Sequence, residues 1–320
     1  MSRKRLTQYF AALFFVGTVV LPVAAEAGTQ HLSVVTGPVG GPMYAISGVW
    51  VDIINKTVPG VQMTNQVGGG SAYTARVLGN GEADFALAGN DIAFYASKGE
   101  NIFEGNAMPE VRSVGALYAE SFHVVVAKNS NIARFEDLRG KKTSIGPPGS
   151  GTLLNSERVL AAYGYAKKDI GAQELGFNES AESLKDNHID AACYMTGIPY
   201  GPIMDVAITK PISVIGLNDD VIAALVAQYP FFVKTRIPAD TYEKTGGFDT
   251  ISVKMLILTT TAMDDDTVYN LTKALVENVE QIQQSHASGR GIGRETILEG
   301  LSVPLHPGAE RYYREAGILK

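Results

Sequence analysis

Short apolar runs alternate along most of the chain with longer segments whose apolar positions recur every three to four residues. The short runs predict β-strands, and the longer segments predict amphipathic helices. This alternation is typical of α/β architecture with largely parallel sheets. The expected strands are 31–36, 61–67, 83–88, 111–117, 122–127, 142–146, 172–177, 190–195, 212–216 and 252–260. The expected helices are 43–56, 72–79, 91–98, 152–163, 180–187, 199–208, 218–228, 264–285 and 308–316.

One local arrangement occurs in both halves of the chain. Leu78 is followed six residues later by Asp84, and Leu184 is followed at the same spacing by Asp190. Each stretch is expected to contain a helix, a polar turn, a strand and a glycine-containing loop. Chance is an open alternative, because a helix followed by an Asp-Ala strand is common in α/β proteins. If the two stretches are equivalent, each belongs to one of two lobes that face each other.

Residues 1–27 have the pattern of a secretory signal peptide. A basic start that includes Arg3 and Arg5 is followed by an apolar run over 9–21 and by Ala-Glu-Ala at 25–27, a small-x-small cleavage pattern. The apolar run is short for a membrane-spanning helix, which needs about 20 residues. We therefore expect cleavage before Gly28 and a periplasmic location. A lipid anchor has no attachment point, because no cysteine lies near the cut.

Composition narrows the classes of partner and the source of stability. Removing the leader changes the formal net charge from −6 to −8, because the leader holds three basic residues and one acidic residue. A mildly acidic chain without basic runs argues against nucleic acid and anionic membranes as partners. Cys193 is the one cysteine, which excludes an intramolecular disulfide. The 45% of hydrophobic residues must therefore supply a core that holds the fold.

Three expected strand-to-helix loops are rich in glycine and hydroxyl groups, and open α/β sheets bind ligands at such loops. The first loop, 37–42, includes Gly40 and Gly41 before a helix. Glycine allows the backbone to approach a ligand closely, and the helix start supplies unpaired N–H groups. The loop lacks the spacing of a dinucleotide fingerprint or of a P-loop. A tight turn is the plain alternative.

The other two loops combine glycines with hydroxyl side chains at a helix start. The second loop, 68–71, contains Gly70 and ends at Ser71, and the third loop, 147–152, ends in Ser-Gly-Thr. Amides and hydroxyls that converge at a helix N-terminus suit a carboxylate without any basic residue. Helix capping by Ser71, Ser150 or Thr152 is the alternative, and capping is compatible with ligand contact.

Further candidates follow other expected strands. Asn90 and Asp91 follow strand 83–88, Tyr118 ends strand 111–117, and 194–197 end strand 190–195. Aromatic residues at a cleft can cover an aliphatic chain of a ligand. Each residue taken alone is equally explained as part of the core or as a helix cap, and capping is the simpler role for Asp91. The set as a whole favours a binding cleft.

Catalytic and metal-binding motifs are absent from the sequence. The five histidines do not share a metal-ligand spacing, so neither a zinc site nor another metal site is expected. The segment 149–151 does not match a nucleophile elbow. Cys193 lies in an apolar strand and is expected to be buried. The acidic run 264–266 precedes a long helix, where acidic residues favour the N-terminus. A binding protein is favoured over an enzyme.

Four stretches carry a resemblance to a known family. They are GEADFA at 81–86, PGSGT at 148–152, YPF at 229–231 and LHPGAERYYREAG at 305–317. Nearly the whole chain after the leader resembles the TAXI solute receptors of TRAP (tripartite ATP-independent periplasmic) transporters. The resemblance implies a two-lobed periplasmic binding protein fold, type II-like, that closes on its ligand. It also implies delivery of the ligand to a TRAP membrane permease driven by an ion gradient.

The resemblance further implies the kind of ligand and the residues that hold it. Glutamate and related dicarboxylates are ligands known in the family, and no cofactor is expected. The family's binding loops correspond to Gly40–Tyr44, Gly69–Ser71, Asn90–Asp91, Ser150–Thr152 and Thr196–Gly197. Together with the aromatic candidates, the expected ligand-binding residues are Gly40, Gly41, Tyr44, Gly70, Ser71, Asn90, Asp91, Tyr118, Ser150, Gly151, Thr152, Tyr194, Thr196 and Gly197.

Two departures from the family pattern fall in this expected site. Tyr44 is followed by Ala45, where family members often have a second aromatic residue, and Asn90 stands where many have serine. These differences put the identity of the ligand in question and leave the class of protein unchanged.

The leading hypothesis is a monomeric transport receptor with two lobes and a hinge. The expected lobes are 28–122 with 253–320, and 123–252, with crossing segments near 119–123 and 248–253 acting as hinges. The alternatives are an exported sensor subunit that presents a small carboxylate to a membrane kinase, and an exported enzyme. A screen of carboxylates and amino acids for thermal stabilisation and for products distinguishes a receptor from an enzyme.

Overall fold

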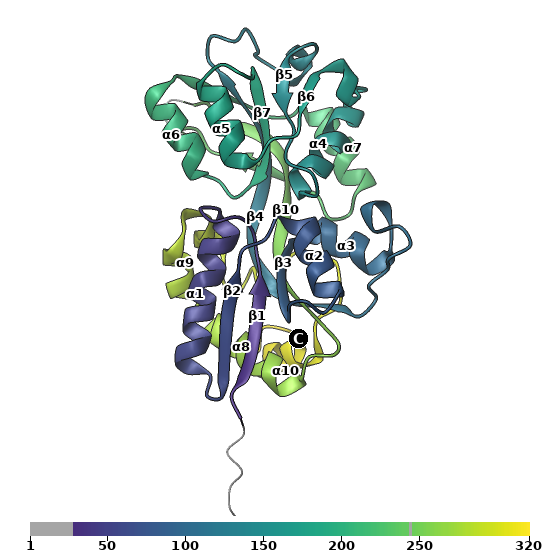
Figure 1. The fold of residues 1–320 in the computed structure, drawn as a ribbon, viewed down its shortest axis with the longest axis vertical. Coiled ribbons are helices and arrows are strands. Elements are labelled where there is room, and N and C mark those ends of the chain that lie inside the picture. The colour runs from purple at the N-terminus through teal and green to yellow at the C-terminus, as the bar shows by residue number, and fades with distance from the viewer. Residues whose placement is uncertain (1–27, 243–244) are drawn as a thin grey trace, which may run out of the picture.

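The computed structural model describes residues 28–242 and 245–320, so the expected signal peptide at 1–27 lies outside the described residues. These residues form two α/β lobes stacked along the long axis of the molecule and joined by two long strands (Figure 1). The strands of both lobes belong to one sheet with the order β2-β1-β3-β10-β4-β7-β5-β6. The expected α/β class and the two-lobed architecture are therefore confirmed.

The first lobe contains the N-terminal strands and both ends of the described chain (Figure 1). Its parallel strands have the order β2-β1-β3, with Val34 of β1 opposite Phe85 of β3. These strands are β1 (Gln30–Val35), β2 (Val61–Gln66) and β3 (Phe85–Gly89). The helices are α1 (Pro42–Thr57), α2 (Ser71–Gly79), α3 (Asn90–Lys98), α8 (Asp265–Glu277), α9 (Val279–Ser285) and α10 (Pro307–Glu315).

The second lobe repeats this arrangement. Its parallel strands have the order β7-β5-β6, so that the first strand of the unit again lies in the middle. These strands are β5 (Lys142–Ser144), β6 (Gly171–Gln173) and β7 (Ala191–Thr196). The helices are α4 (Gly151–Ala162), α5 (Phe177–Lys185), α6 (Gly201–Thr209) and α7 (Asp219–Gln228).

Two antiparallel strands run through both lobes, β4 (Val111–Ala127) and β10 (Phe248–Thr260). In the first lobe β10 also pairs with β3, and in the second lobe β4 pairs with β7 and with β8 (Ile212–Ile215). A hydrogen bond of 2.7 Å joins the Ser121 and Ser252 hydroxyls where the strands cross between the lobes. The expectation of largely parallel sheets therefore holds for the three-stranded units β2-β1-β3 and β7-β5-β6 and not for β4, β8 and β10.

Some expected elements differ from the observed ones. The expected strands 111–117 and 122–127 are one strand, because 118–121 are also extended and pair with β10. The expected helix 264–285 breaks at Asn278, whose side-chain amide donates to the Ala274 carbonyl at 2.9 Å. Strand β9 (Val233–Ile237) was not expected, because it is a short edge strand with charged residues.

The repeated Leu-to-Asp spacing has a structural counterpart. The Asp84 carboxylate accepts hydrogen bonds from the backbone N–H of Ser33 in β1, at 2.8 Å, and from its hydroxyl. The Asp190 carboxylate accepts from the backbone N–H of Lys142 in β5, also at 2.8 Å. In each lobe an aspartate that precedes the third strand thus binds the central strand. The two stretches occupy equivalent positions in the two lobes.

The core lies on both faces of the sheet. In the first lobe Trp50 of α1 packs edge-on against Phe85 of β3, with 5.8 Å between ring centroids. A second cluster of buried side chains, which includes Phe122 and Phe231, continues from the first lobe into the second. Cys193 belongs to it and is buried, as expected. The sheet and this cluster are therefore continuous across the two lobes.

Candidate ligand-binding site

A cleft between the lobes contains two adjoining cavities of ≈ 240 Å³ and ≈ 90 Å³. Both cavities are lined by Pro38 and Met43 of the first lobe and by Gly176 and Phe177 of the second. Glu120 of the crossing strand β4 also lines both. Because the cavities share these walls, we treat them as one chamber, which we call the interlobe chamber.

Four helices begin at the interlobe chamber. Helices α1 and α2 of the first lobe start after Gly41 and Gly70, and helices α4 and α5 of the second lobe start after Ser150 and Gly176. A helix N-terminus has backbone N–H groups without intrahelical partners and carries roughly half a positive charge. Four such ends around one cavity form an anion-binding environment.

The helix starts of the two lobes differ in how their amides are satisfied. No side chain caps α1 or α2. In the second lobe, the Ser150 hydroxyl accepts from the Leu153 N–H at 3.0 Å and donates to the Pro147 carbonyl at 2.7 Å. The Glu179 carboxylate accepts from the Gly176 N–H at 3.3 Å. Side chains therefore bind backbone amides at the two helix starts of the second lobe, whereas α1 of the first lobe begins with Pro42, which has no N–H group.

The loops of the two lobes come close at one wall of the chamber. Gly70 has φ 108° and ψ 176°, a conformation that side-chain-bearing residues rarely adopt. A Cβ at Gly70 would lie 3.6 Å from the Ser150 Cβ, and a Cβ at Gly151 would lie 3.8 Å from the Ser71 hydroxyl oxygen. The run of glycines before α2 thus has two physical reasons here, the positive φ and the approach of the second lobe.

Glu120 is the residue in the chamber that the sequence reasoning missed. Its side chain is only 8% exposed, and its Oε1 accepts a hydrogen bond of 3.3 Å from the Tyr118 hydroxyl. The pKa of Glu120 is raised to about 8, mainly by burial and then by the charge of Asp91, whereas the bond from Tyr118 lowers it. One acidic residue near the middle of a long apolar strand was the sequence signal that could have identified it.

The remaining lining of the chamber is mostly apolar. Pro147, Met195 and Tyr200 add to the apolar walls that both cavities share. None of the described residues that line the chamber is a lysine, arginine or histidine. An anion bound here is therefore held by helix ends and hydroxyl groups instead of a cationic side chain.

Half of the expected ligand-binding residues meet at this chamber. They come from both lobes and from each of the three glycine-containing loops. They are Gly41, Gly70, Ser71, Ser150, Gly151, Thr152 and Thr196. Three of their hydroxyls already have protein partners: Ser150 as described above, Ser71, which accepts from the Gly89 N–H at 3.1 Å, and Thr152, which donates to the Met195 carbonyl at 3.3 Å.

Asp91 does not line the chamber, although it was expected in the site. Its side chain is 1% exposed and forms an ion pair of 3.3 Å with Arg158 of the second lobe. Asn155 also donates to this carboxylate at 2.9 Å. The guanidinium of Arg158 lies over the rings of Tyr95, Tyr229 and Phe231 at 4.8–5.2 Å. Asp91 therefore joins the two lobes beside the cleft, and its negative charge is already paired.

Asn90 likewise has protein partners away from the chamber. Its amide donates to the Gly300 carbonyl at 2.9 Å, and its oxygen accepts from the Lys254 N–H at 3.3 Å. It lines a separate cavity of ≈ 670 Å³ together with Phe231 and with the ion pair of Lys254 and Glu299. Among the described helices, α3 is the one that begins at this cavity. A single helix start does not provide the converging amides that the chamber has.

The other expected residues lie near the chamber without lining it. Tyr118 and Tyr194 are buried, at 2% and 0% exposure, and Tyr118 instead positions Glu120. Gly40 is exposed, and the backbone carbonyl of Tyr44 accepts from Ser47 and Asn65. Gly197 lies where the lobes touch, since a Cβ there would be 2.3 Å from the Ser288 hydroxyl oxygen.

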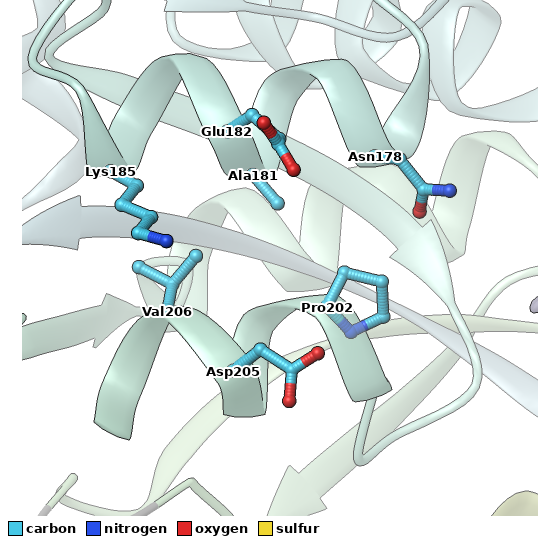
Figure 2. Close-up of a pocket in the computed structure, with 7 residues that line it drawn as sticks. All are labelled: Asn178, Ala181, Glu182, Lys185, Pro202, Asp205 and Val206. Atoms are coloured by element: carbon cyan, nitrogen blue, oxygen red, sulfur yellow. The ribbon is translucent and has the colours of Figure 1, made fainter. Parts of the chain in front are cut away.

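A groove of ≈ 280 Å³ between α5 and α6 lies on the second lobe alone. Figure 2 shows Glu182 and Lys185 on one helix and Asp205 on the other, with Pro202 and Val206 between them. Its charged residues are exposed to solvent. The groove has neither the burial nor the contribution from both lobes that the interlobe chamber has.

The fold is that of two-lobed periplasmic binding proteins. It resembles a protein described as an L-cystine ABC transporter from Listeria monocytogenes, with a TM-score of 0.51 and 15% identity over 82% of this chain and 98% of that one. It also resembles the effector-binding domain of QuiR in complex with shikimate, with a TM-score of 0.50 and 10% identity over 83% and 100% of the two chains. The aliphatic sulphonate binding protein SsuA of Escherichia coli matches with a TM-score of 0.48 and 13% identity, over 91% and 79%.

The chain belongs to the NMT1-like family, whose sequence profile matches residues 34–317. Membership of this family and the two-lobed fold agree with the coarser part of the resemblance described above, a binding protein of the periplasmic type. In the part of the chain that the structure describes, no helix combines the length and apolar character needed to span a bilayer.

Proposed function

We propose that the protein is an exported receptor that binds a small carboxylate in the interlobe chamber and delivers it to a TRAP membrane permease, without chemical turnover. The observation that carries this proposal is the convergence of four helix N-termini on a chamber with no basic side chain among its described lining residues. Unpaired amides at helix ends bind carboxylates well. The resemblance to TAXI receptors supports the permease type and suggests glutamate or a related dicarboxylate.

The proposal includes closure of two lobes about the crossing strands. The lobes would be 28–122 with 253–320, and 123–252. Hinge closure about two crossing strands is a common movement of binding proteins, and only a few residues must change conformation for it. The Ser121–Ser252 hydrogen bond lies where such a hinge is proposed. A signal peptide at 1–27 and a periplasmic location of a monomer are parts of the same proposal.

The test is a double substitution at the start of α4. We expect Ser150→Ala with Thr152→Ala to weaken binding of the best small carboxylate at least tenfold, which corresponds to about 1.4 kcal/mol. The substitutions remove a cap and a hydroxyl from the chamber wall. Isothermal titration calorimetry measures the affinity, and circular dichroism verifies the fold.

Asp264→Ala is the matched control. Asp264 caps α8 by accepting from the Thr267 N–H at 2.8 Å, and α8 does not begin at the chamber. Its loss should lower stability by about 1 kcal/mol and leave affinity unchanged. If the double variant binds the carboxylate as tightly as the wild type does, the proposed site is wrong.

A further inference from the structure

Glu120 has an oxygen available to a ligand in the interlobe chamber. Its Oε1 accepts from Tyr118, while no described residue donates to its Oε2. No lysine, arginine or histidine in the described part of the chain forms an ion pair with it. A carboxyl group that is more than nine-tenths buried and faces a cavity is incompletely satisfied by the protein.

The other two acidic groups near the chamber already have partners. Asp91 is bound by Arg158 and Asn155. Glu179 is exposed and caps α5 through the Gly176 N–H. Glu179 also lines the larger cavity, at its exposed side, so Glu120 is the buried acidic group that a bound molecule would meet inside the chamber.

The charges of the chamber describe the complementary ligand. The helix N-termini attract a negative group. A positive group beside Glu120 favours the ionised form of its carboxyl group over the neutral form that burial favours, so Glu120 suits a cation as its partner. A simple monocarboxylate would leave Glu120 without a partner. A dicarboxylate would bring a second negative charge into a chamber whose described lining contains no basic residue. A zwitterion satisfies both features.

The dimensions and the walls specify the rest of the molecule. The cavity of ≈ 90 Å³ is lined both by Glu120 and by the N-termini of α2 and α4. A ligand with an ammonium group and a carboxylate on the same carbon atom therefore reaches Glu120 and the helix N-termini together. The adjoining cavity of ≈ 240 Å³ has mainly apolar walls, which include Met43 and Phe177. An apolar side chain fits there, because burial of apolar surface is favourable.

We propose that Glu120 selects an α-amino acid with an apolar side chain, an inference that rests on the proposed carboxylate site. The carboxylate binds the N-termini of α2 and α4, the ammonium group binds Glu120, and the side chain packs against Met43 and Phe177. Tyr118 holds the Glu120 carboxyl in place through its hydroxyl. This ligand class differs from glutamate and dicarboxylates in lacking a second negative charge.

Paired probes test the inference. Calorimetry at pH 7 compares leucine with 4-methylpentanoate and phenylalanine with 3-phenylpropanoate, with glutamate and succinate as additional acids. We expect at least one amino acid to bind tenfold or more tightly than its partner without the ammonium group. Glu120→Gln should reduce this ratio to near one, because glutamine keeps the shape and cannot ionise when an ammonium group binds. Tyr118→Phe should reduce it partially.

Glu182→Gln, an identical substitution in the α5–α6 groove, is the control and should leave the ratio unchanged. Equal affinity of both members of each pair, or a ratio that Glu120→Gln does not change, would overturn the inference and leave the carboxylate site intact. Tighter binding of succinate or glutamate than of any apolar amino acid would do the same. If none of the acids binds, both the inference and the proposed function are wrong.

Discussion

The two lobes are built on the same plan, yet their helix starts are satisfied differently. Each lobe has a three-stranded parallel unit with the first strand in the middle and an aspartate that binds this strand. In the first lobe, α1 and α2 begin at glycines without a side-chain cap. In the second lobe, Ser150 and Glu179 bind backbone amides at the starts of α4 and α5. The comparison indicates that both lobes have free helix-start amides at the chamber, and that side chains bind backbone amides at the helix starts of the second lobe.

The largest expected effect on stability comes from breaking the buried ion pair that joins the two lobes. Asp91→Asn removes the charge that balances Arg158, whose side chain is 5% exposed. An unpaired buried charge costs about 3–5 kcal/mol, so we expect the free energy of unfolding in urea to fall by this amount. The exposed pair of Asp266 with Arg311 provides the control, and Asp266→Asn should have little effect. A loss below about 1 kcal/mol at Asp91 would mean that this pair behaves like a surface pair.

Acid should lower the stability of the second lobe through protonation of His123. His123 is buried beside Tyr194 and Tyr242, and burial lowers its pKa to about 4 although the bond to the Ser121 carbonyl opposes this. The unfolded chain therefore takes up a proton near pH 6.5 that the folded lobe takes up only near pH 4. The free energy of unfolding should fall between these pH values by about 3 kcal/mol, at roughly 1.4 kcal/mol for each pKa unit.

Urea titrations at several pH values measure this effect in the wild type and in His123→Gln. The difference between their pH profiles isolates His123 from His286 and His306, whose pKa values burial also lowers. Parallel profiles for the two proteins would show that His123 does not carry the acid sensitivity.

A smaller effect is expected from alanine substitutions at the equivalent glycines before α2 and α5, and it should differ between the two positions. Gly70 has φ 108°, whereas Gly176 has φ −61°, and the nearest atom to a Cβ at Gly176 would be 3.9 Å away. Gly70→Ala should lower stability by about 1–3 kcal/mol and weaken ligand binding, because the backbone must leave its conformation. Gly176→Ala should change either quantity little. Thermal melts and calorimetry on both variants test this asymmetry, which equal losses at the two positions would contradict.

The sequence was sufficient for the parts of the fold that depend on local patterns. Alternating apolar runs identified most strands and helices, and the Leu-to-Asp spacing identified the equivalent positions of Asp84 and Asp190. The glycine loops were identifiable because glycine and hydroxyl residues between a strand and a helix form a local sequence pattern. The continuity of β4 could not be identified from the sequence, because it depends on pairing with β10, which is more than a hundred residues away.

The same distinction applies to the site. Ser71 and Ser150 were identifiable because a hydroxyl next to glycine at a helix start is a local feature. The partner of Asp91 was not, because Arg158 lies on another lobe and no local pattern connects them. Glu120 was missed because its role comes from burial and from the chamber that four distant loops form around it.

A crystal structure of the protein with the tightest-binding small carboxylate tests the central claim most directly. We expect the carboxylate oxygens to accept hydrogen bonds from backbone amides at the starts of both α2 and α4. A carboxylate bound instead in the α5–α6 groove or in the cavity beside Asn90 would contradict the account.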